Sequence, residues 1–126
     1  MLTEREAYAT IPAADLDRAI QWYEAKLGLK PKQRIEGGVM YKTGTHSHFV
    51  IYPTVNAGKG PQTVMAFSSP DVEVEVRNLK ARGVVFEEYD FPGLKTVNSI
   101  AKMGSSRGAW FRDSEGNILG VFEMPA

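Results

Sequence analysis

The chain has 126 residues, of which 43% are hydrophobic and 24% charged, an ordinary composition for a globular protein of one-domain size. Lys and Arg total 15, as do Asp and Glu, and this balance argues against a nucleic-acid scaffold or a polybasic membrane patch. The lack of cysteine excludes disulfides and thiolate metal sites, and no stretch resembles a signal region or membrane span, so we expect a cytoplasmic protein without nucleic-acid or membrane partners.

The first half of the chain reads as a strand, a helix and three further strands. A short strand is predicted at 6–11, ended by Pro12. Asp15 stands where a helix N-cap is needed, and apolar residues then recur at steps of three and four as far as Leu27. Gly28 is the expected C-cap of this helix. The three strands that follow are predicted at 32–36, 39–43 and 48–54.

The pattern restarts after a loop rich in Gly and Asn, 55–61, which is typical of a linker. A strand is predicted at 63–67, and Ser69-Pro70-Asp71 then signals a helix start with proline in the first turn. Valines alternate with glutamates in 72–82, which is strand periodicity, but the start signal and the stop at Gly83 favour a helix. Later strands are predicted at 84–88, 99–103, 108–112 and 118–123, with a hairpin turn at 113–117.

The two halves match each other. When Asp15 is aligned on Asp71, the first strands coincide, and the helices end one residue out of step at Gly28 and Gly83. The surplus residues of the second half fall in 91–104, which we interpret as an insertion. The sequence therefore predicts an α+β fold in which two βαβββ modules, about 4–56 and 61–125, form a single domain, 1–126. Their inner sheet faces are expected to enclose a cleft, with the helices on the outer faces.

Two segments carry a family resemblance. Residues 15–29, with DLDRAIQWYE followed by LGL, resemble the first strand–helix unit of the vicinal-oxygen-chelate (VOC) superfamily, which contains glyoxalases, bleomycin-resistance proteins and extradiol dioxygenases. Residues 109–119 resemble the closing hairpin of that family, with Ser114 in place of its usual proline, and 89–96 is similar to a subgroup of the same superfamily. The resemblance implies the fold, but not one activity, because this scaffold hosts isomerases, dioxygenases, thiol transferases and drug-binding proteins.

The enzymes of this family hold a divalent metal with four side chains, one from each of four inner strands. The resemblance places the equivalent positions at Tyr8, Val50, Val64 and Gly120. Only Tyr8 has a possible ligand atom, and a divalent ion needs several N or O ligands, so we expect no metal and no other cofactor. A register slip of two residues would bring His48 to the position of Val50, and one His with one Tyr is still a poor metal site.

Alternation along the strands predicts which residues line the cleft. This lining is aromatic and small-apolar, with a few hydroxyl groups, which suits a flat or hydrophobic organic ligand. The same residues could instead fill the cleft as ordinary hydrophobic core. The set is Tyr8, Thr10, His48, Val50, Tyr52, Val64, Ala66, Gly120 and Phe122, with Trp110 on a neighbouring strand and facing in either direction.

Five polar side chains are further candidates. His46 and His48 are either solvated beside the Gly44 turn or form a pair on one strand face, with His48 the better candidate for a pocket group or an acid–base near neutral pH. Arg34, Lys42 and Arg112 could bind an anion at the mouth of the cleft, or could simply be solubilising.

Three functions remain open from the sequence. The first is a homodimeric, metal-independent binder of a small aromatic or hydrophobic compound, similar to the bleomycin-resistance branch. The second is a metal-independent lyase or isomerase in which His48 or Tyr8 moves a proton, since the family includes lactoylglutathione lyase and dioxygenases. The third is a stress or interaction protein whose cleft is filled by its own hydrophobic core.

Overall fold

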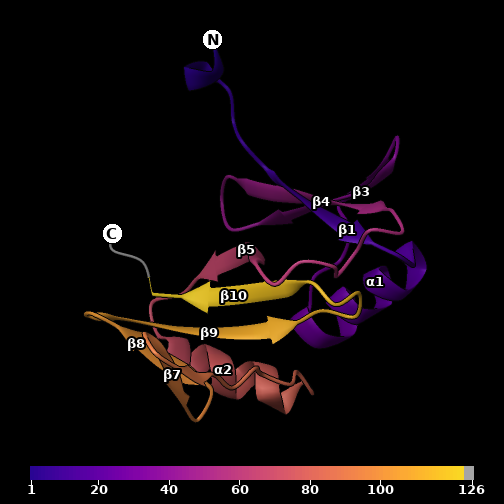
Figure 1. The fold of residues 1–126 in the computed structure, drawn as a ribbon. Helices are drawn as coiled ribbons and strands as arrows, with labels where there is room; N and C mark the ends of the chain where they lie inside the picture. Colours follow the sequence, from indigo (N-terminus) through magenta and orange to yellow (C-terminus); the bar gives the residue numbers. More distant parts are fainter. Residues whose placement is uncertain (124–126) are drawn as a thin grey trace.

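The computed structural model describes residues 1–123, which form two sheets and two α-helices (Figure 1). A short 3-10 turn, Leu2–Glu4, precedes the first module. The first module contains β1 (Ala9–Ala13), α1 (Leu16–Trp22) with a π-helical extension (Tyr23–Leu27), β2 (Gln33–Ile35), β3 (Gly38–Thr43) and β4 (Ser47–Pro53). The second contains β5 (Thr63–Ser68), α2 (Val72–Ala81), β6 (Asp90–Phe91), β7 (Leu94–Val97), β8 (Ile100–Met103), β9 (Ser106–Arg112) and β10 (Ile118–Phe122).

The strand order confirms the predicted repeat. The first sheet has the order β1-β4-β3-β2, and the second begins with the equivalent order β5-β10-β9-β8 before β7 and β6 extend it. In each sheet the first strand of the module pairs in parallel with the last. Val50 lies opposite Thr10 in the first sheet, and Gly120 lies opposite Ala66 in the second, which are equivalent positions of the repeat.

Both predicted helices are present and begin where expected. The side chain of Asp15 accepts a hydrogen bond from the backbone N–H of Arg18, and Asp71 does the same for α2. The segment of alternating valines and glutamates is therefore a helix, with Val72 and Val76 buried on one face. Gly28 ends the first helix in the left-handed region, with φ 72°.

The strand predictions need four corrections. The first strand is Ala9–Ala13 and includes Pro12, which β1 tolerates because it is an edge strand with one unpaired side. Pro70 precedes the N-cap Asp71 and is not in the first turn of α2. The stretch 84–88 pairs only through a bridge at Phe86. The predicted insertion contains the expected strand β8, but also the strand β7, which pairs with β6, and neither β6 nor β7 was predicted. The last two residues expected in the second module lie outside the described residues.

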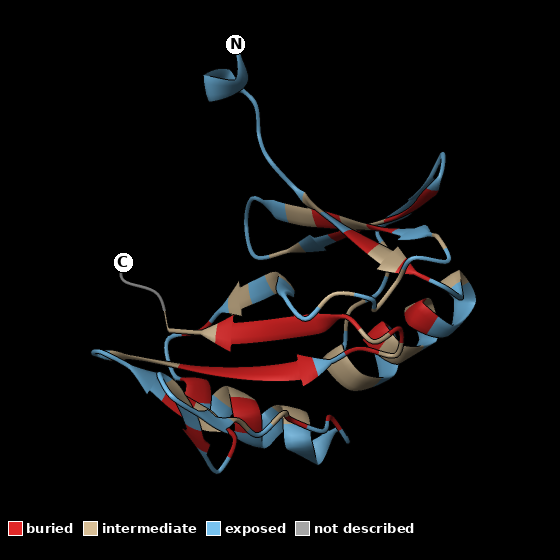
Figure 2. Cartoon of the chain, in the orientation of Figure 1, coloured by how far each residue is buried: buried red, intermediate tan, exposed pale blue. Residues whose placement is uncertain are grey.

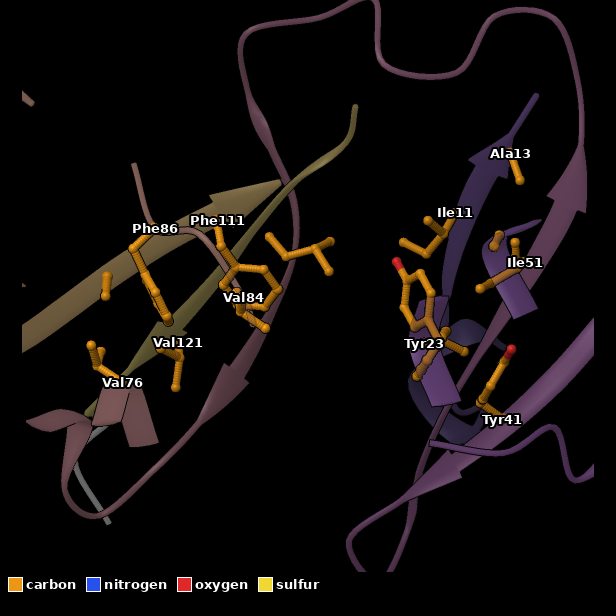
Figure 3. Close-up of a cluster of buried hydrophobic side chains, with 14 of the residues drawn as sticks. Ile11, Ala13, Tyr23, Tyr41, Ile51, Val76, Val84, Phe86, Phe111 and Val121 are labelled. Carbon is orange, nitrogen blue, oxygen red and sulfur yellow. The ribbon is translucent and has the colours of Figure 1, made fainter. Parts of the chain in front are cut away.

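The core lies between the helix-bearing faces of the two sheets (Figure 3). Ile11 and Ile51 approach it from the first sheet, Phe111 and Val121 from the second, and all four are buried. β9 and β10 are almost continuously buried, whereas strands of the first module alternate between buried and open residues (Figure 2). One core therefore joins the two modules.

Within residues 1–123, no helix has the length and apolar character needed to cross a membrane.

Candidate functional site

Most of the predicted cleft residues lie on the faces opposite the shared core. In β1, Ile11 and Ala13 are buried, while Thr10 is exposed and the preceding Tyr8 is 53% exposed. The helices pack against the shared core, so the predicted cleft belongs to the two helix-free sheet faces. They approach each other where β1 and β5, the edge strands of the two sheets, lie side by side.

Tyr8 and His48 form an aromatic pair at this edge. The parallel register that sets Ala9 against Phe49 also brings the preceding residues together. Their ring centroids are 5.1 Å apart and their planes differ by 27°, so the rings are stacked. Within the described chain the His48 imidazole makes no hydrogen bond, which leaves its nitrogen atoms open to a ligand or to solvent.

A groove runs from this aromatic pair along the contact between the modules. It consists of two hollows, of about 240 Å³ and about 500 Å³, that share the lining residues Thr43, Ser47, Ala66 and Phe67. Tyr8 and His48 line the smaller hollow, and Phe122 and Ser68 line the larger one. We call this feature the junction groove. The structure thus brings together four members of the predicted lining, Tyr8, His48, Ala66 and Phe122.

Two other predicted lining residues, Trp110 and Gly120, lie at a small core of the second sheet, which Phe122 also joins. Trp110 faces the same side as its strand partner Gly120, is 8% exposed, and packs edge-on against Phe122 with centroids 5.4 Å apart. The Phe122 ring lies over Gly120, since a Cβ added there would come within 2.4 Å of it. Ile118 and Ala101 complete this cluster. On this sheet, the protein's own side chains occupy much of the face that was predicted to line the cleft.

The remaining predicted residues lie outside the junction groove. Val50 and Tyr52, the latter 37% exposed, sit on the open face of the first sheet together with Thr10. Val64 packs against the shared core, because a register shift between β5 and β10 next to it breaks the simple alternation of faces. His46 and Lys42 line a separate hollow of about 290 Å³ beside His48.

The charged candidates differ in whether they already form hydrogen bonds within the protein. Arg112 donates to Glu87 at 2.8 Å and to the Gly116 carbonyl at 2.9 Å, so it is held by its own hairpin. Arg34 lies on the exposed strand β2 and lines none of the hollows described above. Thr43, Ser47 and Phe67 are groove residues that sequence reasoning missed, because only the long-range contact of the two modules brings them together.

The four positions equivalent to the family's metal ligands do not suit a metal. Tyr8 offers one phenol oxygen, Val50 and Val64 offer only hydrocarbon, and Gly120 has no side chain and is covered by Phe122. Within residues 1–123, no three His, Cys, Asp or Glu residues are grouped so that they could hold a metal ion. The donor set therefore does not match the chemistry that a divalent cation requires.

Several solved structures have a fold similar to that of this chain. UcmS2 superimposes with a TM-score of 0.75 at 19% identity over 95% of this chain and 98% of that one. A bleomycin-binding protein complexed with bleomycin gives 0.71 at 16% identity over 96% and 99%. A lactoylglutathione lyase from Agrobacterium tumefaciens gives 0.64 at 20% identity over 95% and 93%.

No curated protein matches the chain in sequence. The profile of the Glyoxalase/Bleomycin resistance protein/Dioxygenase superfamily, in contrast, matches residues 6–121, which is nearly the whole chain. The repeat of two βαβββ modules, the helix caps and the closing hairpin agree with that match. The protein is a member of the glyoxalase/bleomycin-resistance/dioxygenase superfamily.

Proposed function

We propose that this protein binds a small, flat or hydrophobic organic compound in the junction groove, without a metal or other cofactor. The observation that carries the proposal is the stacked pair of Tyr8 and His48 at the end of the groove. A partly exposed aromatic pair beside a hollow with both polar and apolar walls can stack against a planar ligand, and the free imidazole can add a hydrogen bond. Ser47 and Thr43 add hydroxyl groups along the same wall.

The family membership and the structural neighbours support a binding role. One neighbour is a bleomycin-binding protein, complexed with bleomycin, and its fold covers nearly the whole of this chain. The absence of suitable donors at Tyr8, Val50, Val64 and Gly120 favours binding over the metal-dependent reactions of the family.

We also propose that the protein is a homodimer. The helix-free face of the first sheet is open and partly apolar, with Val50, Tyr52 and Tyr8 on it. A second copy placed on this face would cover these residues and deepen the junction groove from one side.

A titration of Trp110 fluorescence tests the binding role, because Trp110 packs on Phe122, which lines the groove. A Trp22→Phe variant leaves Trp110 as the reporter, and a panel of planar aromatic compounds that includes bleomycin supplies the ligands. We expect saturable quenching that is the same with and without EDTA. Tyr8→Ala should weaken binding about tenfold, since it removes one stacking surface.

Val85→Ala is a control, because Val85 is also an exposed apolar side chain, 80% exposed, and lies outside the groove. It should leave the affinity unchanged. The binding proposal is wrong if no compound of the panel gives saturable quenching, or if EDTA abolishes the binding.

Proton transfer by His48 is a second candidate, favoured by the unengaged imidazole beside the groove. A lyase or isomerase reaction of this kind requires a group within hydrogen-bond reach of the substrate. Full turnover of a candidate substrate by His48→Ala would remove His48 from that role.

A further inference from the structure

A further hollow, of about 930 Å³, lies between α2 and the strands of the insertion. Among the described residues it shares no lining residue with the junction groove. Its walls are the outer side of α2 and one face of the β7–β8 hairpin, which pack at the same end of the molecule (Figure 1). We call it the α2–hairpin groove.

The floor of this groove is apolar and partly open to solvent. Val97 and Ile100 face each other across the β7–β8 hairpin, and Val76 reaches the groove from α2. Val97 is 65% exposed, and Phe91 at the edge is 53% exposed. Val76 itself is 4% exposed, so the apolar surface that a ligand could bury comes mainly from Val97 and Phe91.

The walls of the groove are positively charged. Its lining contains one acidic residue, Glu73, and five basic ones, namely Arg77, Lys80, Lys95, Lys102 and Arg107. The whole chain has a net charge of zero, so this concentration does not reflect a generally basic surface. Like charges gathered on one hollow repel each other and attract an anion.

Three of the five cations remain available to a ligand, because Arg77 pairs with Glu73 at 4.0 Å and Arg107 is engaged more closely. Arg107 is held by Glu123 at 2.8 Å, by Asp71 at 3.2 Å and by Glu73 at 3.3 Å. Lys80, Lys95 and Lys102 form no ion pair with any residue in the described part of the chain. Lys80 stands on α2 and the other two on the hairpin, so they flank the apolar floor from both walls.

The hairpin that carries two of these lysines is held in a costly conformation. Asn98 and Ser99 form its two-residue turn, and both have positive φ, 53° and 74°, without being glycine. Glu88 accepts hydrogen bonds from the Ser99 hydroxyl at 2.6 Å, the Ser99 N–H at 3.1 Å and the Thr96 hydroxyl at 2.8 Å. These bonds fix the turn, and Asn98 itself lines the groove.

We propose that the α2–hairpin groove binds an amphipathic organic anion of small-molecule size. Its carboxylate, sulfonate or phosphate head lies between Lys80, Lys95 and Lys102, and its apolar body lies on Val76, Val97 and Ile100. This ligand differs from that of the junction groove, whose lining among the described residues contains no Lys or Arg. The two sites are occupied independently.

Isothermal titration calorimetry with decyl phosphate, kept below its micelle concentration, tests the site. Decanol and decyltrimethylammonium have the same apolar body without the negative charge. We expect saturable binding of decyl phosphate that weakens as salt is added, and at least about tenfold weaker binding of the other two. Equal affinity for decanol would show a merely apolar surface and would overturn the proposal.

A double variant, Lys95→Glu with Lys102→Glu, should weaken decyl phosphate binding at least about tenfold, because it reverses the charge of one wall. Both residues are exposed, so the fold should be kept. The control is Lys30→Glu with Lys59→Glu, which makes the same change of net charge on exposed residues elsewhere and should alter the affinity by less than about twofold.

Val97→Ser tests the apolar contribution and should weaken binding about threefold. An equal loss in the control variant would attribute the binding to net charge and contradict the site. Binding to vesicles that contain phosphatidylglycerol, without binding of decyl phosphate, would indicate a membrane surface as the partner and would also overturn the proposal.

Discussion

The carboxylate of Glu115 accepts a hydrogen bond from the backbone N–H of Asp15 at 2.8 Å. The turn between β9 and β10 therefore holds the start of α1, although the two residues belong to different modules. Arg18 donates to the same carboxylate at 2.8 and 3.0 Å. We propose that this contact, together with the shared core, makes the two modules unfold as one unit.

Glu115→Gln should lower the free energy of unfolding by about 2 kcal/mol at neutral pH. The hydrogen bond from Arg18, followed by those from Asp15 and Ser114, lowers the pKa of the buried Glu115 to about 2. The figure is smaller than the pKa shift alone would give, because Arg18 is half exposed and its interaction is screened by solvent. Urea denaturation measures the difference.

The same contact predicts a dependence on pH. Because the pKa of Glu115 is lower in the folded state, its contribution is complete above the pKa of the unfolded carboxyl and is lost as pH falls toward 2. The stability gap between the wild type and Glu115→Gln should fall to less than half by about pH 3. Glu87→Gln is the control, because Glu87 pairs with Arg112 at a more exposed site and should show little change. A stability difference between the wild type and Glu115→Gln that stays constant with pH would contradict the lowered pKa of Glu115.

Tyr23→Phe and Tyr41→Phe should differ in their effect on stability. The hydroxyl of Tyr23 is buried and donates to Asp113 at 2.7 Å, so its removal should cost about 1.5 kcal/mol. The Tyr41 hydroxyl is buried without a hydrogen-bond partner among the described residues, so its removal should be neutral or stabilising. Burial raises the pKa of Tyr41 to about 12, and burial together with the Asp113 carboxylate raises the pKa of Tyr23 well above its usual value. Thermal denaturation of the two variants checks the contrast, and equal losses would argue against it.

Gly120→Ala should destabilise the protein by about 2 kcal/mol, because a methyl group there meets the ring of Phe122 at 2.4 Å. The cause is steric, so the same change should cost less when it is combined with Phe122→Leu. A double-mutant cycle read by urea denaturation should give a coupling of about 1 kcal/mol or more. Additive effects would mean that Phe122 does not limit the space at this position.

Tyr52→Glu should favour the monomer. Tyr52 is 37% exposed on the open face of the first sheet, so a charge there can stay solvated in one chain but would be buried by a second copy. Sedimentation velocity at micromolar concentration should show a dimer for the wild type and a smaller species for the variant. A monomeric wild type would refute the proposed dimer.

Much of the fold was predictable because its signals are local. Asp15 and Asp71 mark the starts of both helices, and Gly28 and Gly83 mark their ends, without reference to distant residues. The internal repeat then supplied the long-range order of the strands, since equivalent strands in two copies occupy equivalent places. The valine–glutamate segment also became a helix, because its start signal outweighed the alternation.

The site was harder to predict because it depends on contacts between distant segments. Alternation along β1 and β4 correctly grouped Tyr8 with His48, but no local pattern reveals that Phe122 turns back over Gly120. The direction of Trp110 follows from its register with Gly120, which the sequence alone leaves open. The strand at 99–103 was predicted and corresponds to β8, but the stretch before it lacked a strong periodic pattern, so the short strands β6 and β7 were missed.

The π-helical turn at Tyr23–Leu27 gives a physical account of the one mismatch in the repeat. A turn closed from each residue to the fifth one along holds one residue more than an α-turn. The first helix can therefore contain an additional residue between Asp15 and Gly28 while both of its caps keep their places. We infer that an insertion or deletion of one residue in either copy of such a repeat can be absorbed within the helix, because both of its caps keep their places.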